Sequence, residues 1–293
     1  MFRRRFLDRP VEAARRLTVG HVTLEIVAGS VVGHRYPENF DVLHVDPELP
    51  IAAVADGMGA GEGSRVAGRT AMDTLTERLH ESWPTVGPRE LRAATAAAQT
   101  RVRQAGAGLA ELTGCTITAL VAEPDGEQAW IVQLGDSRAY RLHGGLLELL
   151  TVDHTMAWLG VLHGWWPATS PEAARARYQL LRYVGHPDRP DPDLLAVPLR
   201  PGDTWLLCTD GVSDQLDYHR LRDLLADRDP ARAARALLAA TLAAGGDDNA
   251  TAVLVRSTRR SPPRADGAPP PPPRRRRTSA APPSLPDSDR EHR

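Results

Sequence analysis

The stretch Ala53-Val-Ala-Asp56-Gly57-Met-Gly59 decides how this chain of 293 residues is interpreted. A short apolar run ends there in Asp-Gly, which predicts a buried strand with a carboxylate at its tip and a sharp turn after it. The pattern returns at Cys208-Thr-Asp210-Gly211. Two further acids stand at the ends of apolar segments, Asp248 just before residues 250–255 and Asp41 at the start of another. Four carboxylates so placed predict one oxygen-rich site, suited to hard divalent ions such as magnesium or manganese.

The composition is that of an ordinary globular protein, with 42% hydrophobic and 25% charged residues. Residues 257–293 hold nine arginines against four acids, a net charge of about +5. Since the whole chain carries −1, the preceding residues carry about −6. The globular part therefore lacks the basic surface that nucleic acid would need. No run approaches the roughly 20 apolar residues of a membrane span.

The two cysteines, Cys115 and Cys208, each adjoin an apolar run. Buried free thiols are favoured over a disulfide, which fits a reducing compartment. Residues 1–7 resemble the charged start of a signal peptide, but charged residues interrupt the segment before an apolar stretch can follow. We expect a cytoplasmic location.

The pattern along the chain predicts three parts: a polar arm at 1–18, a folded domain at 19–256 and a tail at 257–293. Strands and helices follow one another without strict β-α-β alternation, which favours an α+β fold with antiparallel sheets and helices packed outside. The strands are expected at 21–32, 42–46, 50–55, 116–121, 129–134, 138–142, 146–150, 194–199, 204–209 and 250–255. The helices are expected near 62–82, 88–107, 171–183, 217–226 and 230–244.

The tail contains Pro269–Pro273 followed by Arg274–Arg277 and shows no apolar periodicity, so we expect it to be disordered. It is interpreted as a solvated tail. The alternative is a docking segment for an acidic partner, nucleic acid, a membrane surface or a proline-binding module.

A single Asp-Gly is most often a turn, so the conjunction of acids carries the argument. A core that gathered Asp56, Asp210 and Asp248 without cations would suffer like-charge repulsion and desolvation. A pair of divalent ions removes that penalty. Two ions bridged by one carboxylate can also hold and deprotonate a water and polarise the phosphoryl group that it attacks.

The order and spacing of several segments resemble the metal-dependent type 2C protein phosphatases, the PPM family, in their compact bacterial form. The resemblance covers about residues 19–256 and implies an α+β fold, a four-layer α-β-β-α sandwich of two antiparallel sheets flanked by helices. The matching segments are Val54-Ala-Asp-Gly-Met-Gly59, Gly61-Glu-Gly-Ser64, Gly135-Asp-Ser-Arg-Ala-Tyr-Arg-Leu142, Leu150-Thr-Val-Asp-His154, Pro201-Gly-Asp203, Leu206-Leu-Cys-Thr-Asp-Gly-Val-Ser-Asp214 and Gly246-Asp-Asp-Asn-Ala-Thr251.

The resemblance also implies a role for each acid at a site for two manganese or magnesium ions. Asp56 is the ligand shared by both ions, and the Gly57 carbonyl joins one of them. Asp210 and Asp248 complete the shell of the other ion. Asp41 holds metal-bound water from behind these ligands.

Four further residues are assigned roles around the two-ion site. Asp214 matches the acid that helps to hold a third, weaker ion, although a helix N-cap before Tyr218 is an equal alternative. Asp136 is interpreted as structural, satisfying backbone amides, and Arg138 as supporting that turn or a neighbouring carboxylate. His154 is interpreted as a hydrogen-bonded histidine below the site and not as the general acid.

The first motif departs from the family pattern. In Gly33-His-Arg-Tyr-Pro-Glu-Asn-Phe-Asp41, Phe40 replaces the usual polar residue and Tyr36 stands where arginine is expected. Arg35 is one position early. An arginine fork suits a phosphate dianion, so we expect Arg35 to bind the phosphate, with an exposed or salt-bridged arginine as the alternative.

Two other segments also differ or vary. Met58 stands where some family members place a histidine acid, which leaves solvent, a metal-bound water or His34 to protonate the leaving group. Residues 155–190 coincide with the family's variable flap. The flap contains Trp158, Trp165 and Trp166, which we expect to pack it onto the domain, with a partner-recognition surface as the alternative.

Three functions follow. The first is a metal-dependent phosphoserine/phosphothreonine protein phosphatase that acts in one step, on a phosphorylated protein from a serine/threonine kinase pathway. The second is a non-catalytic phosphoprotein-binding scaffold of the same fold, supported by the altered first motif. The third is a nucleic-acid-associated protein that acts through Arg274–Arg277.

Overall fold

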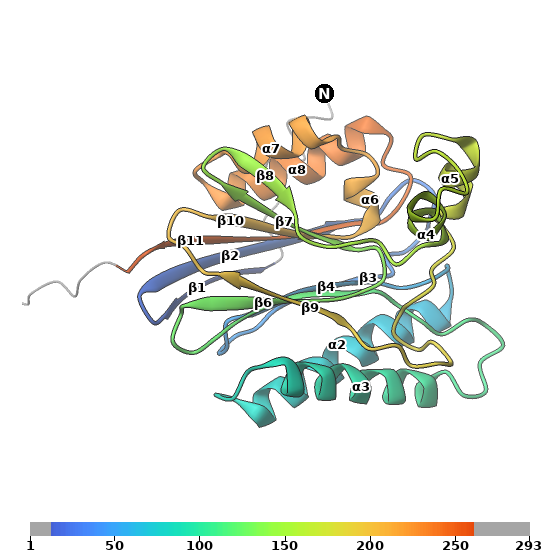
Figure 1. Ribbon diagram of the computed structural model, residues 1–293, viewed down its shortest axis with the longest axis horizontal. Coiled ribbons are helices and arrows are strands. Elements are labelled where there is room, and N and C mark those ends of the chain that lie inside the picture. The colour runs from blue at the N-terminus through green and yellow to red at the C-terminus, as the bar shows by residue number, and fades with distance from the viewer. Residues whose placement is uncertain (1–12, 261–293) are drawn as a thin grey trace, which may run out of the picture. The chain divides into compact units, whose positions relative to one another are not determined.

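The computed structural model describes residues 13–260, which form two antiparallel sheets packed face to face with helices on both outer faces (Figure 1). The α+β fold and its four-layer α-β-β-α arrangement are therefore confirmed. Among residues 13–260, no helix combines the length and the apolar character that crossing a bilayer requires.

All neighbouring strands in the two sheets are antiparallel. The six-stranded sheet consists, in spatial order, of β1 (Ala13–Val19), β2 (Val22–Val31), β11 (Ala250–Arg259), β10 (Thr204–Cys208), β7 (Arg138–His143) and β8 (Leu146–Leu149). The five-stranded sheet consists of β3 (Asp41–Val45), β4 (Ile51–Asp56), β5 (Ile117–Ala122), β6 (Gln128–Leu134) and β9 (Asp193–Pro198).

The central strands are buried on both faces, because each sheet packs against the other sheet on one side and against helices on the other. This explains why β4 and β5 are continuous apolar runs, whereas one-sided strands alternate. The core between the sheets includes Leu24, Ile26 and Trp205, each fully buried.

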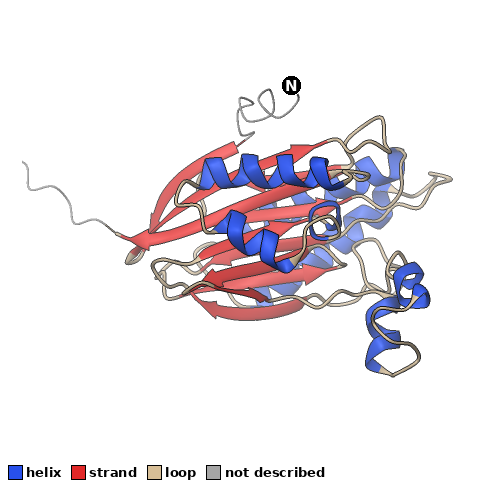
Figure 2. Ribbon diagram, turned by 90° about the horizontal axis from the view of Figure 1, so that it is seen from above, coloured by secondary structure: helices blue, strands red, loops and turns tan. Residues whose placement is uncertain are grey.

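The helices divide between the two outer faces and a separate flap. The five-stranded sheet is covered by α2 (Glu62–Ser82) and α3 (Pro88–Ala105), and the six-stranded sheet by α6 (Asp210–Ser213), α7 (Tyr218–Leu225) and α8 (Pro230–Ala244). The flap carries α4 (Met156–Leu162) and α5 (Pro171–Ala176), and Figure 2 shows it standing out at one end of the sheets.

Three expectations about the bounds of elements and parts were wrong. The arm predicted at 1–18 is a strand from Ala13 onward, because the backbone of β1 pairs with β2 along the sheet edge while its polar side chains face solvent. The helix predicted at 171–183 ends at Ala176. The chain then returns to the domain, where Leu180 pairs with Thr155 and Val184 with Cys115. The domain also extends past residue 256, since β11 continues to Arg259. The tail predictions for 261–293 lie outside the described residues.

Candidate active site

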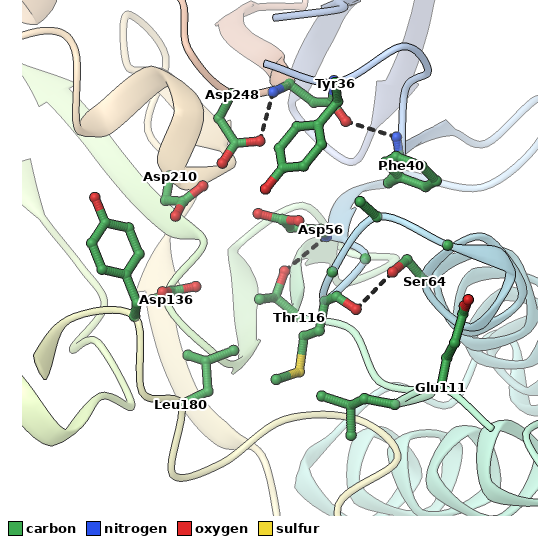
Figure 3. Close-up of a pocket in the computed structure, with 18 residues that line it drawn as sticks. Tyr36, Phe40, Asp56, Ser64, Glu111, Thr116, Asp136, Leu180, Asp210 and Asp248 are labelled. Carbon is green, nitrogen blue, oxygen red and sulfur yellow. Dashed lines mark hydrogen bonds between the residues drawn. The ribbon is translucent and has the colours of Figure 1, made fainter. Parts of the chain in front are cut away.

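Strand ends from both sheets meet around a cavity of about 570 Å³ (Figure 3). Asp56 ends β4 of the five-stranded sheet, whereas Asp210 follows β10 and Asp248 precedes β11, both of the six-stranded sheet. All three carboxylates line the cavity, as does Gly57. The structure thus brings together the acids that the sequence predicted as ligands. It adds Asp136, which comes from the turn between β6 and β7.

Asp41 does not line this cavity but lies next to Asp56, which does. It is the cross-strand partner of Asp56, so the two side chains share one face of the sheet. Its Oδ2 accepts hydrogen bonds from the hydroxyls of Thr209, at 2.8 Å, and Thr251, at 2.7 Å. Burial raises the pKa of Asp41 to about 7 despite these two bonds. The threonines were not predicted from the sequence, although each lies within three residues of a predicted ligand.

The cavity disfavours the ionised form of the acids that line it. Burial, and then the charges of Asp41 and Asp210, raise the pKa of Asp56 well above its ordinary value. Burial, and then Asp214 and Asp248, raise the pKa of Asp210 to about 6. The pKa of Asp136 is raised in the same way, by burial and by Asp210. Like charges therefore crowd a desolvated space.

These residues fit divalent cations. Oδ1 of Asp210 is buried and has no hydrogen-bond partner, and a buried oxygen of this kind is expected to bind a cation or water. The donors are oxygens, which hard ions prefer. Among residues 13–260, no three Asp, Glu, His or Cys side chains lie close enough together to form a complete metal-binding cluster. The fit therefore rests on donor chemistry and charge.

A second cavity, of about 260 Å³, adjoins the first and shares Asp210 and Asp248 with it. Arg35 lines this second cavity and not the first. Arg177 of the flap lines it too, and forms an ion pair with Asp214 at 2.9 Å.

The helix cap considered for Asp214 belongs to another residue. Asp217 caps α7 and accepts a hydrogen bond from the amide of Arg220 at 2.8 Å. Asp214 itself lies at the end of α6, and burial raises its pKa while Arg177 opposes the shift.

Arg138 and His154 have supporting positions. Arg138 donates two hydrogen bonds to the carboxylate of Asp153, at 2.8 and 2.6 Å. His154 is buried, and its Nδ1 accepts from the amide of Gly135 at 3.0 Å. Its Nε2 contacts Asp193 and Arg182. Both ring nitrogens are engaged, as expected for a histidine that holds the turn below the site.

Tyr36 is the residue at the cavity that sequence reasoning left without a role. Its ring lines the acid-lined cavity, and Figure 3 shows its hydroxyl oxygen pointing toward the carboxylates. Burial, and then the charge of Asp248, raise the pKa of Tyr36. The sequence did hold a signal for this role, because Tyr36 stands at the position where the family pattern has an arginine.

The flap tryptophans serve different purposes. The expectation that the tryptophans pack the flap onto the domain is wrong for two of them, because Trp158 is 46% exposed and Trp165 is 57% exposed. Trp166 is partly buried against Gly160 of the same flap. Both cysteines are buried and free, as predicted.

The four-layer fold and the acid-lined cavity together define a serine/threonine protein phosphatase of the metal-dependent class. The chain belongs to the protein phosphatase 2C family, whose sequence model matches residues 39–251. That range contains Asp41, Asp56, Asp210 and Asp248 but begins after Arg35 and Tyr36.

Similar proteins and solved structures support this assignment. The serine/threonine phosphatase stp of Listeria welshimeri is 27% identical over 201 residues, which cover 67% of this chain and 80% of that protein. The catalytic domain of the serine/threonine protein phosphatase PstP, solved with two manganese ions, is 29% identical with a TM-score of 0.71, over 81% of this chain and 99% of that one. PppA, a regulatory component of type VI secretion in Pseudomonas aeruginosa, is 30% identical with a TM-score of 0.69, over 83% and 100%.

Proposed function

We propose that this phosphatase hydrolyses phosphoserine and phosphothreonine in proteins in one step, with two divalent ions, manganese or magnesium, in the acid-lined cavity. The observation that carries the proposal is the convergence of four partly buried carboxylates whose charges repel one another. Such a cluster is costly unless cations neutralise it. When bound, two ions supply a bridging water of lowered pKa as the nucleophile and polarise the phosphoryl oxygens.

The chain's own residues divide the work as follows. Asp56 would serve both ions, and the Gly57 carbonyl would join it at one of them. Asp210 and Asp248 would serve the other ion from the opposite sheet. Asp41 is held by two threonine hydroxyls and would orient water beside Asp56.

Two further roles belong to the second cavity. Asp214 would help to hold a third ion, in competition with its ion pair to Arg177. Arg35 would attract the substrate phosphate from this side, since its cavity shares Asp210 and Asp248 with the first.

The test is hydrolysis of a phosphothreonine peptide by the full chain, with manganese or with chelator. Asp210→Asn removes one ligand charge at constant size and should lower metal-dependent turnover about 100-fold or more. Asp217→Asn is the matched control, because asparagine caps a helix as well as aspartate does. Folded protein that binds manganese yet shows no turnover would contradict the proposal and favour the phosphoprotein-binding scaffold.

The substrate class would place the protein opposite a serine/threonine kinase in a signalling pathway. The relatives named as serine/threonine phosphatases support this partner class. Two free buried thiols support a reducing, cytoplasmic location.

A further inference from the structure

The segment 33–40 is fixed against the loop that carries Asp248. The amide of His34 donates to the carbonyl of Gly246 at 2.7 Å, and the amide of Arg35 donates to the carbonyl of Asp247 at 3.0 Å. Gly33 permits this approach, since a Cβ there would lie 2.1 Å from the carbonyl oxygen of Asp248. The segment therefore has a defined position beside a predicted metal ligand.

The two departures from the family motif pack against each other. The rings of Tyr36 and Phe40 meet edge to face, with centroids 6.1 Å apart and planes at 88°. The guanidinium of Arg35 lies 5.2 Å from the Tyr36 ring centroid. Phe40 is itself buried, and its amide donates to the side chain of Asn249 at 2.8 Å. An aromatic edge and a cation thus hold the Tyr36 ring in place.

This packing places Tyr36, and not Arg35, in the cavity that Asp56 lines. Tyr36 lines the acid-lined cavity with its hydroxyl pointing inward (Figure 3), whereas Arg35 lines the neighbouring cavity. Around the hydroxyl, the cavity walls carry Asp56, Asp210 and Asp248. No arginine lines this cavity in the described part of the chain. Any phosphate that enters therefore meets a phenol where an arginine fork was expected.

We propose that the Tyr36 hydroxyl binds the substrate, donating a hydrogen bond to a phosphoryl oxygen in the acid-lined cavity. This rests on the proposed function. A phenol is a hydrogen-bond donor at neutral pH and carries no charge. It supplies one directional bond where an arginine would supply two and a full positive charge. Phosphate binding at this position therefore depends on the hydroxyl and is less sensitive to salt than a guanidinium contact.

The test compares the full-length, manganese-loaded protein with Tyr36→Phe, which removes only the hydroxyl. Inorganic phosphate is the probe, and calorimetry measures both its affinity and that of manganese. A hydrogen bond to a charged acceptor corresponds to a roughly ten- to hundredfold loss of phosphate affinity in the variant. Manganese affinity should not change, which also shows that the variant is folded. Tyr183→Phe is the control, since Tyr183 lies outside the cavity.

Kinetics and a rescue variant complete the test. The kcat/KM of Tyr36→Phe on a phosphothreonine peptide should fall by a similar factor. Tyr36→Arg should restore phosphate affinity and make it more dependent on salt. Unchanged phosphate affinity and unchanged kcat/KM in Tyr36→Phe would overturn the role of Tyr36. An absence of manganese-dependent turnover in the unsubstituted protein would instead overturn the proposed function.

Discussion

Gly211 brings two acid-bearing segments together at the level of a single residue. A Cβ at this position would stand 1.9 Å from the backbone oxygen of Asn249, so only glycine permits the contact. The C-terminal end of β10 and the start of β11 can then present Asp210 and Asp248 to the same cavity.

Gly211→Ala is expected to force these two segments apart. The overpacking should cost about 1–3 kcal/mol in the free energy of unfolding, and manganese affinity should fall roughly tenfold or more. Urea unfolding and calorimetric titration with manganese measure the two effects. In the control Gly87→Ala, the added Cβ meets its nearest neighbour at an ordinary 3.4 Å. A Gly211→Ala protein that behaved like this control would show that the close approach is not required.

At the scale of the elements, Asp46 joins the turn after β3 to the end of α2. It is 1% exposed, and its Oδ1 accepts from the amides of Glu48 and Leu49. Its Oδ2 contacts Nε2 of His80, at 2.7 Å, and of His44, at 3.1 Å. Burial alone would raise the pKa of Asp46, but these hydrogen bonds outweigh it and lower the pKa.

A lowered pKa means that the folded protein favours the carboxylate, so its stabilising effect is present above the unfolded pKa of about 3.9 and is lost as the pH falls through the folded value. Asp46→Asn should therefore cost about 1–3 kcal/mol at pH 7. The difference from wild type should narrow below about pH 4. Urea unfolding at pH 7, 5 and 3.5 measures it, with exposed Asp73→Asn as the control. A gap that stayed constant over this range would rule out the charged state of Asp46 as its source.

For the whole molecule, the acid-lined cavity joins the two sheets, since Asp56 comes from one sheet and Asp210 from the other. Cations bound there would link both halves of the sandwich. Manganese at about 100 times its dissociation constant should stabilise the protein by about 2.7 kcal/mol over the chelated state, measured as a rise in Tm.

The same measurement on Asp210→Asn should give a higher Tm in chelator and a smaller rise with manganese. In chelator, this variant should melt at a higher temperature than wild type, because one of the mutually repelling buried charges is gone. Manganese should then raise its Tm less. If the variant melted below wild type in chelator, repulsion among the acids would not be the dominant cost of this site.

The sequence alone determined the features that depend on neighbouring residues. The helices predicted at 62–82 and 230–244 have these bounds in the structure. At α8, Pro230 and the Asp229 cap, whose Oδ1 accepts from the amides of Ala231 and Arg232, mark the start locally. The Asp-Gly strand ends marked Asp56 and Asp210 for the same reason, since an apolar run and its turn are adjacent in the chain.

Only the tertiary structure decided the features that depend on distant partners. Asp41 is held by Thr209, which lies 168 positions away, and no local pattern encodes that bond. The polar strand β1 forms because β2 offers a free edge. Asp136 lines the cavity because its turn packs, at Gly135, against Thr116 from a distant part of the chain. The direction of Tyr36 follows from Phe40 and Arg35 around its ring. Local propensity fixes strand ends and helix caps, whereas the direction of a side chain at a cavity is set by long-range packing.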